Sequence, residues 1–184
     1  MSSQPNPWEG CALEQFSGRH LTEEAYDPTG IIYSGLYSLT GYDVMDILIS
    51  LHSRPNPQVD IGPVDTSCPI IICSLMQEDQ PIVYASPSFL ELTGYTMNEV
   101  LNRNCRFLQA PDGRVNSKSA RKYVDEKTVK KMRKAVERNA ELQVKVRNFK
   151  KNGQPFINYL TMIPIMYKSN VYNYSIGFQG EAPE

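Results

Sequence analysis

The sequence predicts an α+β fold with an antiparallel sheet, and three features of the chain support that prediction. Five segments show the apolar or alternating pattern of β-strands: residues 70–74, 81–85, 142–149, 156–165 and 172–179. Lys151-Asn152-Gly153 separates the third and fourth segments, as expected for the turn of a β-hairpin. Apolar residues recur at helical spacing in two further segments, one before the first strand and one before the third.

Length and proline content predict one folded domain with an N-terminal extension. A chain of 184 residues is long enough to bury a hydrophobic core. Residues 1–35 are rich in Pro, Gly, Ser and Glu, so we expect an irregular extension there. Residues 36–66 are expected to form a cap helix and a proline-rich hinge, and residues 67–184 are expected to form the main domain.

Bulk properties argue against several classes of protein. The net charge of −1 gives no field that would attract nucleic acid or a membrane surface, and no apolar run is long enough to cross a bilayer. The N-terminus does not resemble a secretory signal, so an intracellular protein is expected. The four cysteines match no zinc motif and the chain has two histidines, so we expect neither a metal site nor a catalytic triad.

The cap helix is predicted to have more apolar surface than a single packing face requires. Its main stripe consists of Val44, Ile47, Leu48 and Leu51. Met45 and Ile49 widen that stripe. The composition favours a helix packed on its own domain, and the alternative is a helix that also meets a partner or a second copy of the chain. The prolines that follow make the hinge either a plain linker or a stiff connection that transmits movement.

Cys105 has two interpretations from the residues alone. Thr96 and Glu99 fit a capping box that starts a helix, and Asn104 to Gln109 fit a second helical turn. A cysteine near a helix N-terminus with Arg106 beside it has the surroundings of a reactive thiol. Free cysteines are nevertheless mostly inert core residues, so composition by itself favours a buried, unreactive Cys105.

Each strand of the predicted hairpin places an asparagine in its apolar row. Asn148 ends the row of the first strand, and Asn158 lies within the row of the second. A buried amide without a partner costs about 1–3 kcal/mol, so two of them suggest that a flat polar ligand lies against the sheet. Equally, each amide could lie at the end of a row and reach water. In the last strand Gly177 leaves room for a ring, whereas periodicity leaves the exposure of Gln179 open.

A polar loop over residues 110–123 carries four cationic side chains. They are Arg114, Lys118, Arg121 and Lys122. The loop is either a solvated surface segment or a clamp for phosphate, because arginine binds phosphate oxygens in a bidentate way. Asp125 is expected to cap a helix that runs to about Asn139, and the lysines of that helix are interpreted as solvated rather than as a nucleic-acid site.

Asn104-Cys105-Arg106-Phe107-Leu108-Gln109 resembles the signature of LOV domains, the flavin-binding blue-light sensors of the PAS superfamily. The stretches at 82–86 and 88–95 are similar to the strand and helix that precede this signature, and Ile176-Gly177-Phe178-Gln179 is similar to the closing strand. The resemblance covers about residues 68–179. The N-terminal part and the long loop are most similar to fungal LOV photoreceptors of the Vivid/Envoy type. The resemblance implies a PAS/LOV fold, with a five-stranded antiparallel sheet, flanking helices and an N-terminal cap helix.

The resemblance also implies roles for individual residues. Cys105 matches the photoreactive thiol, and Gln179 matches the residue that relays the signal. The implied flavin contacts are Asn104, Arg106, Gln109, Arg121, Asn148, Asn158 and Gln179, with Arg106 and Arg121 matching phosphate ligands. Residues matching positions that line the flavin are Ile71, Met132 and Met162, for which ordinary core packing is an equal alternative. The longer loop implies FAD as the cofactor, with FMN as the alternative.

In this family, blue light drives the cysteine sulfur to bond with flavin carbon C4a, and the bond breaks again in darkness. Flavin N5 becomes protonated, so Gln179 is expected to reorient its amide. We expect the reorientation of Gln179 to alter the surroundings of Cys68 and Cys73, where the hinge joins the main domain. This change is expected to shift the cap helix so that the protein dimerises. Output is then expected from binding and not from an enzymatic activity. The implied partner is a White-Collar-type transcription factor, which predicts photoadaptation and a cytoplasmic and nuclear location.

Two other classes of function stay open at this point. A flavin oxidoreductase or flavin-based redox sensor would also bind the cofactor, although the chain has no nicotinamide fingerprint such as G-x-G-x-x-G. A PAS domain used only as a protein-interaction module would contain no chromophore, and its Cys105 would matter only for packing. Direct binding to nucleic acid or to a membrane is not expected.

Overall fold

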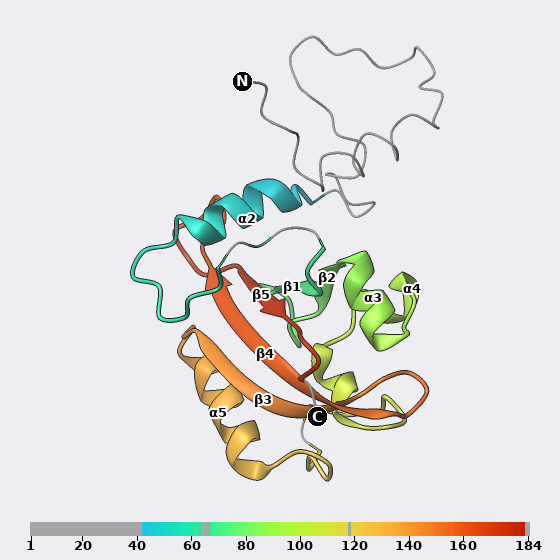
Figure 1. Ribbon diagram of the computed structural model, residues 1–184. Helices are drawn as coiled ribbons and strands as arrows, with labels where there is room; N and C mark the ends of the chain where they lie inside the picture. The colour runs from blue at the N-terminus through green and yellow to red at the C-terminus, as the bar shows by residue number, and fades with distance from the viewer. Residues whose placement is uncertain (1–41, 63, 65–66, 118, 183–184) are drawn as a thin grey trace, which may run out of the picture. The chain divides into compact units, whose positions relative to one another are not determined.

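The computed structural model describes residues 42–62, 64, 67–117 and 119–182, and these residues fold around one five-stranded sheet (Figure 1). The strands are β1 (Ile70–Ser74), β2 (Ile82–Ala85), β3 (Leu142–Phe149), β4 (Pro155–Ile165) and β5 (Tyr174–Phe178). Their order in the sheet is β2-β1-β5-β4-β3, and every neighbouring pair is antiparallel. The predicted α+β class and five-stranded antiparallel sheet are confirmed. The predicted extension over residues 1–35 lies outside the described residues.

Within the described residues, five helical segments lie around the sheet, and side chains cap several of them. They are α2 (Val44–His52), α3 (Pro87–Thr93), α4 (Met97–Val100), the 3₁₀ helix η1 (Cys105–Gln109) and α5 (Glu126–Glu137). Asp43, Ser86 and Asp125 each accept a hydrogen bond from the first turn of the helix that follows. The predicted capping box is present, because the Glu99 carboxylate accepts from the Thr96 backbone N–H at 2.9 Å.

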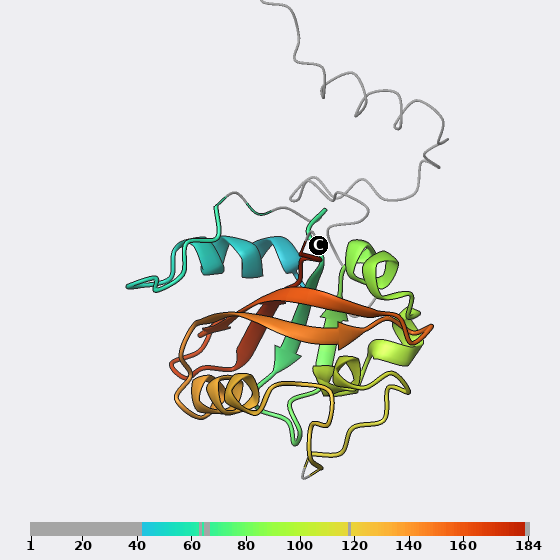
Figure 2. The ribbon, with the colours of Figure 1, turned by 60° about the horizontal axis from the view of Figure 1, so that its bottom comes forward.

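The two faces of the sheet bury different sets of apolar side chains. Successive residues of a strand point to opposite faces, and β1 follows this rule. Ile70 and Ile72 pack in a cluster with α2, whereas Ile71 and Cys73 pack in a cluster with α3, α4 and η1. A third cluster joins α5 to β3 and β4. Figure 2 shows α2 and α5 on opposite sides of the sheet. The predicted cap helix therefore packs on its own domain.

The last strand is shorter than the predicted 172–179 at both ends. Asn173 belongs instead to the β4–β5 connection, where its side chain accepts from the Tyr167 N–H and donates to the Tyr167 carbonyl, each at 2.8 Å. Gln179 follows the end of β5, and its backbone N–H donates to the Pro69 carbonyl at 2.9 Å. Gln179 therefore lies directly beside the segment that connects the hinge to β1.

A single carboxylate holds the hinge against the start of β3. Glu141 accepts from the Arg54 guanidinium at 2.7 Å and from the backbone N–H groups of Gln58 and Val59 at 2.8 and 2.7 Å. The side chains of this ion pair are each 10% exposed. Desolvation raises the pKa of Glu141, but the hydrogen bonds from Arg54 and the two N–H groups outweigh it, so the pKa lies below its usual value.

Replacing Glu141 with alanine is expected to lower the free energy of unfolding by about 2–4 kcal/mol at neutral pH. The reason is that the substitution leaves the half-buried Arg54 charge and two N–H groups without their acceptor. Because the folded pKa is lowered, this stabilisation is present above the ordinary glutamate pKa of about 4.3 and is lost as the pH falls further. Urea denaturation at several pH values measures the difference.

Glu126→Ala provides the matched control, since Glu126 forms an i,i+4 pair with Lys130 in which both side chains are well exposed. It should leave the stability essentially unchanged. If Glu141→Ala is as stable as the control at neutral pH, the carboxylate does not anchor the hinge.

Candidate functional site

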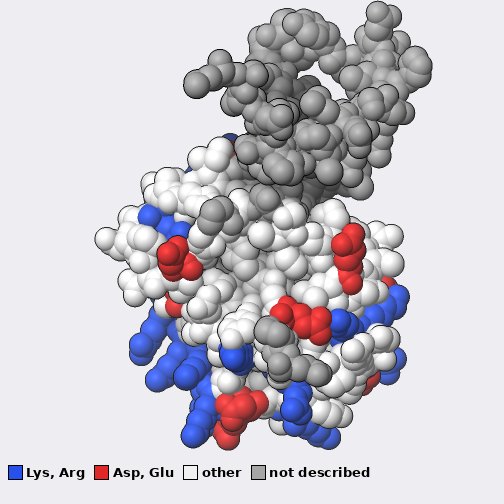
Figure 3. All heavy atoms as spheres, in the orientation of Figure 1, with Lys and Arg blue, Asp and Glu red and all other residues white. Residues whose placement is uncertain are grey.

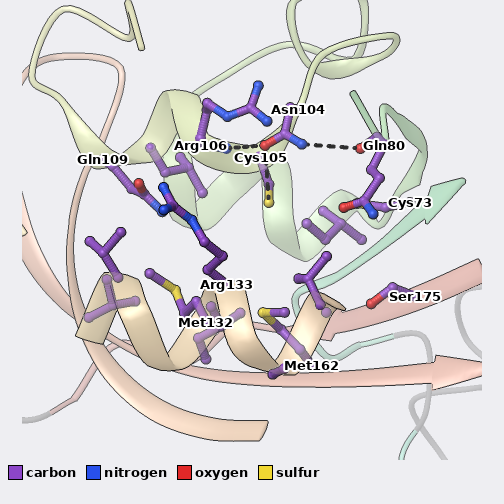
Figure 4. A pocket seen from close by; sticks show the side chains of 18 of the residues that line it. Cys73, Gln80, Asn104, Cys105, Arg106, Gln109, Met132, Arg133, Met162 and Ser175 are labelled. Atoms are coloured by element: carbon purple, nitrogen blue, oxygen red, sulfur yellow. Dashed lines mark hydrogen bonds between the residues drawn. The ribbon is translucent and has the colours of Figure 1, made fainter. Parts of the chain in front are cut away.

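A cavity of about 270 Å³ lies between the sheet and the helices η1 and α5. Its walls are mostly apolar and include Ile71, Leu108, Met132, Val146, Leu160 and Met162. Figure 4 shows η1 on one side of the cavity and Met132 of α5 with Met162 of β4 on the other. The volume is close to the lower end of the range for small-molecule sites, about 300–1,000 Å³. All three predicted lining residues, Ile71, Met132 and Met162, border this cavity.

Three amide side chains form a buried polar cluster, and two of them, Asn148 and Gln179, line the cavity. Asn148, Asn158 and Gln179 are 3%, 0% and 7% exposed. Asn158 Nδ2 donates to Asn148 Oδ1 at 2.8 Å and to Gln179 Oε1 at 2.5 Å. Its own oxygen accepts from the Gly180 N–H at 3.2 Å. Both asparagine side chains are shielded from solvent. The structure therefore rules out the alternative in which each amide lies at the end of its row and reaches water.

Gly177 brings the β5 backbone close to the cavity. A Cβ atom at this position would lie 3.0 Å from Ile71 Cγ1 and 3.1 Å from Gln179 Nε2. Such contacts are shorter than ordinary van der Waals distances, so a side chain here would have to displace Ile71 or the Gln179 amide. The absence of a side chain leaves that part of the wall flat, as the sequence predicted.

Cys105 lies at the start of η1, half-buried, and its side chain points into the cavity (Figure 4). Asn104 caps this helix by accepting from the Arg106 N–H at 3.0 Å, and Asn104 Oδ1 also lies 4.0 Å from Cys105 Sγ. The Cys73 thiol lies beside Cys105, and the Arg106 charge is nearby. The Cys73 thiol and that charge lower the pKa of Cys105, whereas contact with Cys105 and burial raise the pKa of Cys73.

The two arginines predicted to bind phosphate lie at the mouth of the cavity with partners of their own. Arg106 forms a fork-like pair with both oxygens of Asp79 at 2.5 and 2.6 Å. Arg121 Nε donates to Gln109 Oε1 at 2.9 Å, and its Nη1 donates to the carbonyls of Asn116 and Ser119. Arg121 thereby folds the loop before α5 back onto η1 and fixes the side chain of Gln109.

The structure separates the two cysteines that were predicted to act together at the hinge. Cys68 is half-buried beside the α2 cluster, and its carbonyl accepts from Ser86 Oγ at 2.9 Å. Cys73 is 8% exposed in β1, on the opposite face, and borders the cavity beside Cys105. The sequence could have predicted this placement, because alternate residues of a strand share a face and Cys73 is two positions after Ile71.

Two features of the site were not anticipated from the sequence. Arg133 of α5 borders the cavity, and the sequence analysis gave this residue no role. Asp79 pairs with Arg106 across a separation of 27 residues, which no local pattern indicates. Elsewhere on α5, lysines and arginines gather on the surface at the lower left of Figure 3. In the described part of the chain there is no cluster of metal-ligating side chains and no helix able to span a membrane.

Comparison with known proteins identifies the family. A family model described as "PAS domain" matches residues 67–179. Blue light receptor lreA of Aspergillus flavus is 44% identical over 152 residues, which is 83% of this chain and 18% of that protein. White collar 1 protein of Neurospora crassa is 42% identical over 144 residues, 78% of this chain and 12% of that protein. The chain thus spans less than a fifth of the length of these two relatives.

A solved structure corresponds to most of this chain. The light-state dimer of the fungal blue-light photoreceptor Vivid is 60% identical, covers 80% of this chain and 99% of its own, and superposes with a TM-score of 0.75. This chain therefore belongs to the PAS-domain family and, within it, to the fungal LOV blue-light photoreceptors.

Proposed function

We propose that this protein senses blue light through a flavin held in the cavity, with Cys105 as the photoreactive thiol. The observation that carries the proposal is that Cys105, Asn148 and Gln179 border one apolar cavity, with Asn158 bonded to both amides behind its wall. In this arrangement a flat ring could place its polar edge against the amides and one of its faces beside the thiol. The identity with Vivid, a blue-light photoreceptor, supports the same function.

The residues around the cavity fit a flavin at both ends. The amides offer donors and acceptors to the carbonyls and N–H of the ring edge, and Gly177 lets the ring approach the sheet closely. At the mouth, Arg106 and Arg121 could exchange their present partners for phosphate oxygens, because a guanidinium binds phosphate in the same bidentate geometry as the Asp79 carboxylate. FAD is favoured over FMN because Arg121 belongs to the long loop, which offers additional surface beyond the phosphate.

A bound flavin supplies a ring that absorbs blue light, a carbon, C4a, that accepts a sulfur, and a nitrogen, N5, that takes up a proton. Cys105 is the thiol positioned to react, since its pKa is lowered and its side chain points into the cavity. Gln179 is the amide positioned to respond to protonation of the flavin nitrogen. Asn158 donates to Gln179 Oε1, so Gln179 Nε2 is left as a donor towards the cavity. A ring atom that changes from acceptor to donor would favour the opposite orientation of this amide.

A change at Gln179 has a short route to the hinge. Its backbone N–H is bonded to the Pro69 carbonyl, and the neighbouring Cys68 carbonyl is held by Ser86 Oγ. Residues Ile61, Val64 and Cys68 of the hinge pack with α2 on the far face of the sheet. We propose that reorientation of Gln179 shifts this segment and α2, and that the protein then forms a homodimer. The light-state dimer of Vivid and the exposed Met45 and Ile49 of α2 support this proposal.

The output proposed for the protein is binding and not catalysis. The proposed partner is a White-Collar-type transcription factor, and the similarity of this chain to White collar 1 protein supports that choice. In that role the protein would act in the cytoplasm and nucleus and would damp the response to light. A flavin-based redox function is the second candidate, and the paired thiols of Cys73 and Cys105 are the observation that favours it.

Absorption spectroscopy tests the proposed function. The purified protein should show a structured flavin band in the blue that a light pulse removes and darkness restores. Cys105→Ala should keep the band and lose the response to light, because it keeps the cavity and removes the sulfur. Cys68→Ala is the matched control and should bleach like the parent, since Cys68 lies on the opposite face of the sheet. A colourless parent protein, or a Cys105→Ala variant that still bleaches reversibly, contradicts the proposal.

Gly177→Ala is expected to weaken flavin binding by about tenfold and so to lower the flavin content of the protein, if ring binding loses roughly 1.4 kcal/mol through the added methyl group. The methyl group would crowd Ile71 and the Gln179 amide. Gly180→Ala is the control, because its nearest neighbour would be Tyr159 Cβ at an ordinary 3.8 Å. The ratio of flavin to protein absorbance measures occupancy. Equal occupancy in the two variants would show that the ring does not approach β5 at Gly177.

A further inference from the structure

Cys73 and Cys105 approach each other from different elements of the fold. Cys73 belongs to β1, Cys105 opens η1, and the two are separated by 32 positions in the sequence. Both side chains border the same cavity and pack in the same apolar cluster. Each thiol shifts the pKa of the other, so the two side chains lie beside each other in this cluster. Both cysteines are free thiols in this structure.

The surroundings make the two sulfurs chemically unequal. The Cys73 thiol beside it and the Arg106 charge lower the pKa of Cys105, whereas burial and the Asp79 charge oppose them. Cys73 is 8% exposed within a strand, and its pKa is raised. One thiol is thus suited to attack an oxidant, and the other is held next to it as the thiol that can react in the second step. This is the arrangement of a redox-sensitive cysteine with a resolving partner.

We propose that Cys73 and Cys105 form a dithiol that a hydroperoxide converts to an intramolecular disulfide, which removes the thiol needed for light sensing. The Cys105 thiolate attacks a peroxide oxygen, the O–O bond breaks, and Cys105 becomes a sulfenic acid while alcohol or water leaves. The Cys73 sulfur then attacks the Cys105 sulfur, an S–S bond forms, and the S–O bond breaks with release of water. Two thiols are oxidised and one peroxide is reduced, so atoms and electrons balance.

The consequence for light sensing rests on the proposed function, whereas the disulfide itself does not. A Cys105 sulfur bonded to Cys73 has no free thiol and cannot react with any ligand of the cavity. A thiol reductant would restore it. The protein would therefore respond to light only while the cavity thiols are reduced, and Cys73 would also protect Cys105 from irreversible oxidation, since a disulfide forms in place of sulfinic acid.

Peptide mapping by mass spectrometry tests the inference directly. The full-length protein carries Cys11→Ser, which removes the cysteine outside the described residues, and is treated in darkness with increasing hydrogen peroxide. Digestion without reductant should then yield a Cys73 peptide linked to a Cys105 peptide, in an amount that rises with peroxide. Cys68→Ser should give the same linked peptide, because Cys68 lies on the other face of the sheet. In Cys73→Ser, Cys105 should instead accumulate as sulfinic acid.

Light-induced bleaching of the same samples gives an independent readout. Bleaching should fall in proportion to the linked fraction and return after treatment with dithiothreitol. If Cys105 is oxidised or unmodified without ever being linked to Cys73, the inference is wrong, even in a protein that senses light normally. If the linked peptide forms but the reduced protein never bleaches, the proposed function is wrong and the dithiol inference stands.

Discussion

Asn158 is completely buried in the middle of the sheet, and its amide group depends on two other side chains for its hydrogen bonds. It donates to Asn148 and Gln179 at once and accepts from the Gly180 N–H. A buried amide that loses a partner destabilises the fold by about 1–3 kcal/mol. The orientations of the three side chains are consequently coupled. If Gln179 turned its nitrogen towards Asn158, two donors would face each other, and the cluster would have to rearrange.

This coupling connects the cavity to the N-terminal segment. Gln179 lies immediately after β5, where its side chain belongs to the amide cluster and its backbone is bonded to Pro69. Pro69 precedes β1, and the hinge leads from there to α2 on the other face of the sheet. Glu141 fixes the first part of the hinge to β3 through Arg54 and Val59. The hinge is therefore held at two places, one of which is adjacent to the residue expected to respond to light.

Local patterns in the sequence predicted most of the fold. Asp125 capped its helix as expected, and the alternation in 142–149 gave β3 with its observed limits. The cap helix begins after Asp43, whose carboxylate accepts from the Asp46 N–H. The predicted last strand was too long at both ends. The Asn173 side chain takes the place of strand pairing with Tyr167, and such a bond between distant residues leaves no periodic signal.

The site was predictable where it lay on regular strands and unpredictable where it depended on contacts across the fold. Parity along β3 and β4 placed Asn148 and Asn158 in apolar rows, and the structure buries both. The resemblance supplied Cys105 and Gln179, which periodicity alone left open. The Cys73 contact with Cys105 and the Asp79 pair with Arg106 join residues that are far apart in sequence. Only the three-dimensional arrangement of β1, η1 and their connecting turns shows them.

Sedimentation velocity of the parent protein and of Gln179→Leu, in darkness and under blue light at high concentration, tests most directly whether this amide carries the signal. Leucine keeps the bulk of the side chain and removes both hydrogen-bonding groups. The account predicts that both proteins bleach, that the parent sediments faster in light, and that Gln179→Leu does not change. A Gln179→Leu variant that sediments faster in light to the same extent as the parent would contradict the account.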